Sequence, residues 1–174
     1  MTTVCGEWVD SLALTKSAFD YVSAKWESST TCVTVGRSAR ASAVLRSIDS
    51  GYTWTDVTDT VTISQHVLLT DIAAGPSKAY VVTGININST TNSKDGVAYT
   101  FKDGKTFSVS LKLAGVGLNG AAVGLNGVAF VVGVSGKIYR SVLDTFDNDI
   151  FGWTDVSPTT VTVKRSSTCC TTFI

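Results

Sequence analysis

The chain has 174 residues, of which 44% are hydrophobic and 16% are charged, and its 14 basic and 14 acidic residues give a formal net charge of zero. This composition is typical of a globular protein with a sizeable core, and it gives no electrostatic reason to expect a nucleic-acid partner. No apolar run reaches the roughly 18 residues that a membrane span needs. The N-terminus lacks the basic start and long apolar stretch of a signal peptide, which leaves the compartment open.

Three β-branched runs, each ending in glycine, predict strands followed by turns. They are Thr31–Gly36, Ala79–Gly84 and Val128–Gly133. After each run comes a loop and then a second predicted strand, at Ala43–Arg46, Val97–Phe101 and Lys137–Ser141. Helical periodicity is weak along the whole chain, and the best helix candidate, Leu12–Ala24, has a poor pattern.

A tight-turn motif of the form Ser-x-Asp-x-Gly-x-x-Trp follows the first pair of predicted strands. Its members are Ser47, Asp49, Gly51 and Trp54. The short side chains of Ser and Asp can bond backbone N–H groups a few residues on, and Gly allows the positive φ that many tight turns require. Trp supplies a large apolar face where the next strand begins. The motif therefore predicts a strand–turn–strand unit held by its own side chains.

Four aromatic residues mark a repeat along the chain. They are Trp8, Trp54, Phe107 and Trp153, separated by 46, 53 and 46 residues. This spacing fits an array of four-stranded units. The segment after Trp153 repeats the segment after Trp54 almost residue for residue, whereas the second and third copies of the turn motif are incomplete.

The turn motif resembles the Asp-box, or BNR repeat, of sialidases and related β-propellers such as photosystem assembly factors. In that family the box lies between the third and fourth strands of a blade, its Trp packs between blades, and it is non-catalytic. The resemblance and the repeats imply an all-β fold, a β-propeller of four-stranded antiparallel blades that forms a single domain over residues 1–174. Whole blades are expected at Asp20–Thr58, Leu68–Leu111 and Gly115–Ser157, with a fourth blade shared between the termini. A fragment of a larger propeller, or a ring completed by oligomerisation, are alternatives.

The cysteines bear on how the ring closes. A shared blade would bring Cys5 near Cys169 and Cys170, so that one of these two could form a disulfide with Cys5. The alternative is four reduced thiols, and Cys32 is expected in the core.

The chain has a single histidine, His66, and no Cys-x-x-Cys pair, so a zinc site is not expected. Asp144, Asp147 and Asp149 could gather around calcium, but their spacing matches no known loop motif, and a solvated acidic hairpin is the alternative. No metal and no cofactor is therefore expected.

Catalytic groups are hard to find. Sialidases use an arginine triad, a tyrosine nucleophile and acidic partners, but Arg46 and Arg140 occupy matching repeat positions and are expected to serve the blade. Glycoside hydrolysis generally needs paired carboxylates in a cleft, and no pair stands out in the sequence. The protein is therefore expected not to be an enzyme.

The loops between the second and third strands of each blade are the expected ligand-binding face. The first loop carries Arg37 and Arg40, and the second, Ile85–Gly96, carries Asn86, Asn88 and Lys94. Amides suit sugar hydroxyls or a peptide backbone. Trp26 lies outside the repeat register, either as a platform on which a sugar stacks or as a core residue.

These observations favour a non-catalytic binding or scaffold module that engages a protein partner through its loop face. A lectin-type propeller that binds a glycan and a fragment of a sialidase-like glycoside hydrolase are the alternatives. The expected partner is thus a protein or a glycan, without nucleic acid or a membrane span, and a homo-oligomer is a further option.

Overall fold

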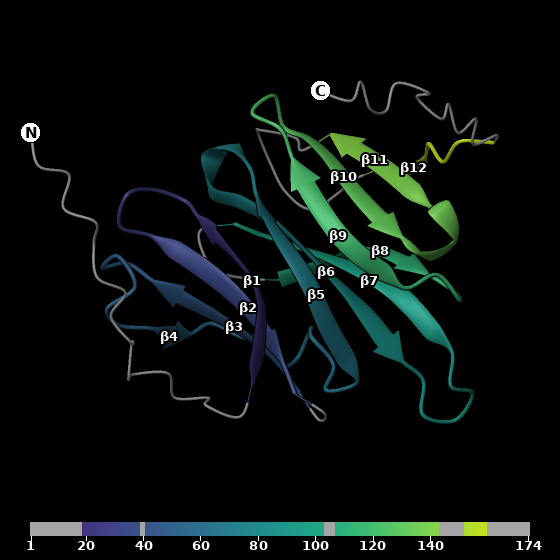
Figure 1. Ribbon diagram of the computed structural model, residues 1–174, viewed down its shortest axis with the longest axis horizontal. Coiled ribbons are helices and arrows are strands. Elements are labelled where there is room, and N and C mark those ends of the chain that lie inside the picture. The colour runs from purple at the N-terminus through teal and green to yellow at the C-terminus, as the bar shows by residue number, and fades with distance from the viewer. Residues whose placement is uncertain (1–18, 39–40, 103–106, 143–151, 160–174) are drawn as a thin grey trace, which may run out of the picture.

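The computed structural model describes residues 19–38, 41–102, 107–142 and 152–159. They form three consecutive four-stranded antiparallel sheets, here called blades 1, 2 and 3 (Figure 1). Blade 1 contains β1 (Asp20–Trp26), β2 (Cys32–Arg37), β3 (Ser42–Ser47) and β4 (Thr55–Asp56). Blade 2 contains β5 (Val67–Ala74), β6 (Ala79–Ile87), β7 (Lys94–Lys102) and β8 (Phe107–Leu113). Blade 3 contains β9 (Leu118–Val123), β10 (Val128–Gly133), β11 (Ile138–Val142) and β12 (Thr154–Asp155).

The predicted all-β fold and the three whole blades are confirmed. Each sheet is a meander in which strands adjacent in sequence pair with each other. Two short 3-10 turns, η1 (Pro76–Lys78) and η2 (Val134–Gly136), are the helical segments of the described chain. The helix suggested for Leu12–Ala24 is wrong over Asp20–Ala24, because this segment pairs with β2 as an edge strand. The shared fourth blade, the cysteine pairings proposed for it and the three aspartates considered for calcium lie outside the described residues.

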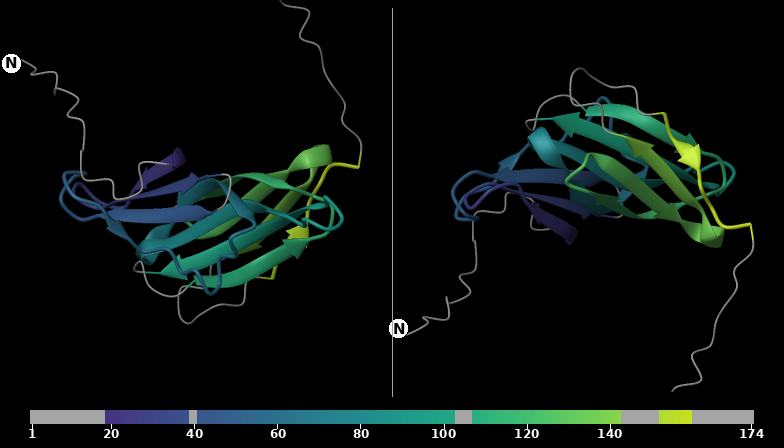
Figure 2. Two further views of the ribbon diagram at one scale, coloured as in Figure 1. Left: turned by 90° about the horizontal axis from the view of Figure 1, so that it is seen from below. Right: turned by 90° about the horizontal axis from the view of Figure 1, so that it is seen from above.

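The blades lie side by side in chain order, with β5 between β1 and β9 (Figures 1 and 2). Side chains on successive strand positions point to opposite faces of a sheet, so a blade between two others has a core on both faces. Within β6, Val82 accordingly packs toward blade 1 and Val81 packs toward blade 3. Burial of both faces of blade 2 explains why the first half of β6 is an unbroken apolar run in the sequence. The described blades do not by themselves show a closed ring.

A glycine in each second strand occupies the same register position in all three blades, although β2 continues beyond it to Arg37 and β6 to Ile87, so the predicted strand ends are too early there. Gly36, Gly84 and Gly133 pair with Tyr21, Leu69 and Leu118 of their first strands. A Cβ at Gly36 would lie 2.8 Å from the Tyr21 ring, and one at Gly133 would lie 2.6 Å from a backbone oxygen. Because any larger residue would collide at these positions, the glycine that ends each predicted run marks equivalent positions in the blades.

The turn between β3 and β4 forms through the side chains that the motif predicts. The Ser47 hydroxyl donates to Asp49 Oδ1 at 2.8 Å and accepts from the Gly51 N–H at 2.9 Å. Asp49 Oδ1 also accepts from the Thr53 N–H at 2.9 Å. The Trp54 Nε1–H donates to the Gly51 carbonyl at 3.0 Å, and the ring of Trp54 is half-buried. Gly51 has a φ of 92°, which a side chain would strain.

Two further features of the described chain concern its thiols and its helices. Cys32 is a free thiol buried in β2, as expected. Among the described residues, no helix is long and apolar enough to cross a membrane.

Candidate functional site

A pocket of about 390 Å³ lies on blade 2 beside the hairpin that joins β6 to β7. Six polar side chains contribute to its lining: Thr62, Ser64, Asn86, Asp95, Tyr99 and Lys112. An apolar wall is formed by Val97, Val109 and Leu113. The pocket is therefore mixed in chemistry, with hydrogen-bonding groups arranged around an apolar surface.

Strand register brings the pocket residues together from three strands. Asn86 pairs with Asp95, and Tyr99 pairs with Val109 across the β7–β8 ladder. Paired residues share a face of the sheet, and Tyr99 belongs to the core between blades 1 and 2, which identifies the face as the one toward blade 1. The pocket thus opens beside the contact between these two blades.

The connection from β4 to β5 supplies another wall of the pocket. Ile63 in this connection is buried in the core between the blades, 3% exposed. Its backbone N–H donates to the Asp59 carbonyl at 2.8 Å. Because Ile63 anchors the segment, its neighbours Thr62 and Ser64 are held at the pocket.

Tyr99 is the aromatic residue of the pocket. Its side chain is almost fully buried, and burial raises the pKa of Tyr99 to about 12. The hydroxyl therefore stays protonated at neutral pH. It has no hydrogen-bond partner among the residues described, so it is available to donate to a ligand.

Asp95 is the carboxylate of the pocket. One of its oxygens, Oδ1, accepts a hydrogen bond from the Gly115 N–H at 2.8 Å. The pocket also contains an amide at Asn86 and an ammonium group at Lys112, which is exposed. These groups can donate and accept hydrogen bonds, but they do not include a second carboxylate in the described lining.

The structure brings only one of the predicted ligand-binding residues into the pocket. Asn86 lines it, whereas Lys94 is exposed at the start of β7 and is not part of the lining. The Asn88 side chain closes its own turn, because its Oδ1 accepts from the N–H groups of Thr90 and Thr91 at 2.9 and 3.2 Å. The predicted loop Ile85–Gly96 is too long, because its first three residues, 85–87, belong to β6 and pair with its last three residues, 94–96, which belong to β7.

The remaining candidates lie elsewhere. Arg37 ends β2 and does not line the pocket, and Arg40 lies outside the described residues. Trp26 is the last residue of β1, at the opposite end of its blade, and 58% of it is exposed. The suggestion that Trp26 is a core residue is therefore wrong, because the strand ends there and its side chain remains accessible.

Sequence reasoning missed Tyr99 and Lys112. Tyr99 lies in a run whose pattern predicts only a strand, although the alternation of Asp95, Val97 and Tyr99 would place all three on one face. Lys112 carries no local signal, because its position at the pocket depends on its pairing with Val97.

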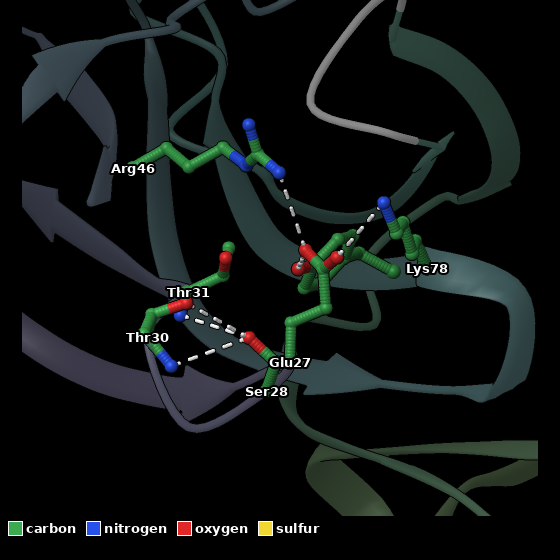
Figure 3. Close-up of polar contacts among 7 residues, drawn as sticks. Glu27, Ser28, Thr30, Thr31, Arg46 and Lys78 are labelled. Atoms are coloured by element: carbon green, nitrogen blue, oxygen red, sulfur yellow. Dashed lines mark hydrogen bonds and ion pairs between the residues drawn. The ribbon is translucent and has the colours of Figure 1, made fainter. Parts of the chain in front are cut away.

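A second polar cluster surrounds Glu27 at the other end of the blades (Figure 3). The Tyr80 hydroxyl donates a short hydrogen bond to Glu27 Oε2. Arg46 Nη2 lies 3.5 Å from the same oxygen, and Lys78 Nζ lies 3.7 Å from Oε1. The Glu27 side chain is only 9% exposed, so this cluster holds a buried carboxylate between cations from both blades.

The Glu27 cluster joins blade 1 to blade 2 and is separate from the pocket. Tyr80 and Asn86 are six residues apart on β6, which is roughly 20 Å in an extended strand. Burial, followed by the hydrogen bond to Glu27, raises the pKa of Tyr80 above its ordinary value, so its hydroxyl remains a donor. With one carboxylate and no described cavity, the arrangement is that of a structural contact.

Neither polar region resembles a metal centre. No group of three His, Cys, Asp or Glu side chains is close enough to hold an ion within the part of the chain described. His66, the single histidine of the sequence, is exposed in the turn before β5.

The fold and these sites define an all-β protein built from propeller-like blades. No family model matches the sequence, and no curated protein matches it. The fold is similar to the crystal structure of a GH74 xyloglucanase from Xanthomonas campestris, with a TM-score of 0.51 and 15% sequence identity. The similarity covers 72% of this chain and 18% of the xyloglucanase chain. That enzyme belongs to a β-propeller family, so the likeness supports the blade architecture, while the Asp-box relationship stays a prediction.

Proposed function

We propose that the protein is a non-catalytic binding module and that it holds a glycan in the blade 2 pocket. The observation that carries this proposal is the lining, in which a protonated phenol, an amide, a carboxylate and an ammonium group surround an apolar wall. A sugar ring offers hydroxyl groups to polar side chains and C–H groups to an apolar surface, so it matches both parts of the lining. The structural neighbour is a xyloglucanase, which supports the choice of polysaccharide at the level of fold analogy alone.

The absence of turnover is part of the proposal. Retaining and inverting glycosidases generally use two carboxyl groups on either side of the scissile bond. In the described lining Asp95 is the sole carboxylate, and the Gly115 N–H holds one of its oxygens. Binding without hydrolysis is the function that this set of groups supports best.

A binding measurement with matched variants tests this function. Isothermal titration with xyloglucan oligosaccharides, preceded by a broad glycan array, would measure affinity for the wild type and for Tyr99→Phe. The variant removes one hydroxyl donor and leaves the ring in place. We expect it to weaken binding by roughly 5-fold, the effect of losing about 1 kcal/mol from one hydrogen bond.

Two lysines at the same end of blade 2 provide a control for charge. Lys112→Ala removes a pocket residue and should reduce affinity, whereas Lys94→Ala removes an exposed lysine outside the lining and should not. Trp26→Ala should also leave affinity unchanged. Equal effects of Lys112→Ala and Lys94→Ala, or a blank array with folded protein, would contradict the proposal. Release of reducing ends from the same sugars would show that the protein is an enzyme.

A further inference from the structure

Blade 3 exposes the face that points away from blade 2, here called the open face. Phe130 and Val132 on β10 are 37% and 41% exposed, and Val156, just after β12, is 42% exposed. Phe130 pairs with Arg140, which in turn pairs with Thr154, so the three apolar side chains lie on one side of the sheet. A contiguous exposed apolar face of this kind is typical of an interaction surface.

The equivalent face of blade 1 is covered. Val33 pairs with Arg46 as Phe130 pairs with Arg140, so Val33 and Val35 hold the places of Phe130 and Val132. Both valines are 0% exposed. The residues that share their core cluster begin with Ile63, in the connection that follows β4, and continue along β5 with Val67, Leu69 and Ile72. On blade 1, the chain segment that follows the last strand therefore helps to cover this face.

The chain leaves blades 1 and 3 by the same path. The Val57 N–H donates to the Val44 carbonyl, and the Val156 N–H donates to the Ile138 carbonyl, both at 2.9 Å. In each blade the hydroxyl of the next residue accepts from the N–H of the same β-strand residue, also at 2.9 Å. Since Val44 pairs with Val35 and Ile138 pairs with Val132, the two exits are equivalent.

The residues that follow blade 3 also repeat those that follow blade 1. Thr60–Ile63 reads Thr-Val-Thr-Ile, and Thr160–Val163 reads Thr-Val-Thr-Val. Ile63 is 3% exposed and Val61 is 93% exposed, so Val163 is the member of the second copy that matches a core residue. The three residues after Ile63 are exposed, and polar residues stand at the matching places of the second copy: Lys164, Arg165 and Ser166.

We propose that the open face of blade 3 is the docking surface for the segment of this chain that follows it, residues 160–174, with Val163 in the place that Ile63 takes on blade 1. This segment lies outside the described residues. Its length suits the contact, because residues 163–174 are as many as residues 63–74, which run from the anchor to the end of β5. The contact requires neither an N-terminal residue nor the glycan pocket, so either proposal can fail without the other.

The test measures whether position 163 is shielded in the full-length protein. Cysteine is a small apolar residue that a core tolerates. Val163→Cys places a thiol at the position that matches buried Ile63, and Val161→Cys places one at the position that matches exposed Val61. After reduction with a phosphine, alkylation by iodoacetamide is followed by mass spectrometry. Trypsin cleaves after Arg140 and Lys164, so the introduced thiol lies in a peptide without a native cysteine.

We expect the thiol of Val163→Cys to react at least roughly 10-fold more slowly than the thiol of Val161→Cys, because alkylation of a shielded group requires local opening. Adding Val132→Glu places a charge on the open face and should bring the two rates together. Because Val132 is already partly exposed, this change should leave the circular dichroism spectrum unaltered. Leu125→Glu, at a turn residue that is 99% exposed, is the control and should preserve the difference in rate.

Equal alkylation rates for Val163→Cys and Val161→Cys would overturn the proposal. A difference that Val132→Glu does not reduce would also overturn it, because position 163 would then be shielded away from the open face. Shielding that disappears on dilution would assign the open face to the segment of another copy and would exclude the contact within one chain.

Discussion

At the scale of single residues, Asp49 shows how a local motif closes a turn. Its two carboxylate oxygens accept from the side chains of Ser47 and Thr53 and from the Thr53 N–H. The hydrogen bond from the Thr53 hydroxyl is the largest of the effects that lower the pKa of Asp49 from its ordinary value to about 2. All of these partners lie within four residues of Asp49, so the turn depends little on the rest of the fold.

The lowered pKa of Asp49 predicts a pH dependence of stability. The group binds its proton more weakly in the folded protein, so its bonds stabilise the fold above the ordinary pKa of 3.8 and are lost as pH falls toward 2. Asp49→Asn should lower Tm at pH 6, and the difference from wild type should shrink between about pH 4 and pH 2. Thermal melts across this range would measure it.

Asp155 is a second carboxylate that contributes to the same acid dependence of stability. The Lys137 ammonium is the first cause that lowers the pKa of Asp155 to about 2, so Asp155 titrates in the same window. A double variant, Asp49→Asn with Asp155→Asn, should flatten the acid limb of the melt more than either change alone. A difference between wild type and Asp49→Asn that stays constant with pH would refute the assignment.

At the scale of secondary-structure elements, the contact between blades 1 and 2 combines apolar packing with one buried carboxylate. Glu27 lies in the turn after β1, which the Ser28 hydroxyl shapes by accepting from the N–H groups of Thr30 and Thr31 (Figure 3). Tyr80 on β6 donates to the Glu27 carboxylate, and the Tyr80 ring stacks on the Phe101 ring with 4.6 Å between the ring centroids. Since the carboxylate is largely shielded from water, removal of one of its hydrogen-bond donors should lower the free energy of unfolding more than removal of a donor at the surface would.

Tyr80→Phe tests the contribution of this contact. The change removes the hydroxyl that donates to Glu27 and should lower the free energy of unfolding by about 1.5 to 3 kcal/mol, the range for hydrogen bonds to charged groups. Tyr99→Phe is the matched control, because the Tyr99 hydroxyl has no bond to another described group, and it should change stability by less than about 0.5 kcal/mol. Denaturant melts would compare the two. Equal losses in the two variants would refute the role of Glu27.

At the scale of the whole molecule, each described blade packs only against its neighbours in sequence. Such arrays behave as nearly one-dimensional systems, in which a terminal unit is stabilised by a single interface. Blade 3 makes its described contacts with blade 2 alone, through Leu118, Ala129 and Val131. As a terminal blade, blade 3 should therefore open more readily than blade 2, which has an interface on each face.

Leu118→Ala would test whether blade 3 opens by itself. Leu118 is fully buried between blades 2 and 3, so its truncation to Ala should lower the free energy of unfolding by about 2 to 5 kcal/mol. Hydrogen exchange should accelerate in β9 to β11 and stay slow in β1 to β3. Leu125→Ala, at a fully exposed turn residue, is the control and should change neither the free energy of unfolding nor the exchange rates. Uniform acceleration over all three blades would show that the molecule unfolds as one unit.

The sequence by itself determined the blades and the closed turn. Both depend on patterns within a few residues of each other, namely the alternating or continuous apolar runs, the glycines that end them, and the bonding of Asp49 to Thr53. The predicted blade limits agree with the strands because every blade repeats these local rules.

Only the tertiary structure decided where the sites lie. The pocket requires Thr62 from a connection and Lys112 from a different blade strand to meet Tyr99 through strand register, and no local pattern specifies this meeting. Glu27 and Tyr80 are 53 residues apart in the chain. Whether an apolar position such as Val132 is core or surface depends on whether a neighbouring blade covers it, which the residue type cannot reveal, because its equivalent Val35 is fully buried.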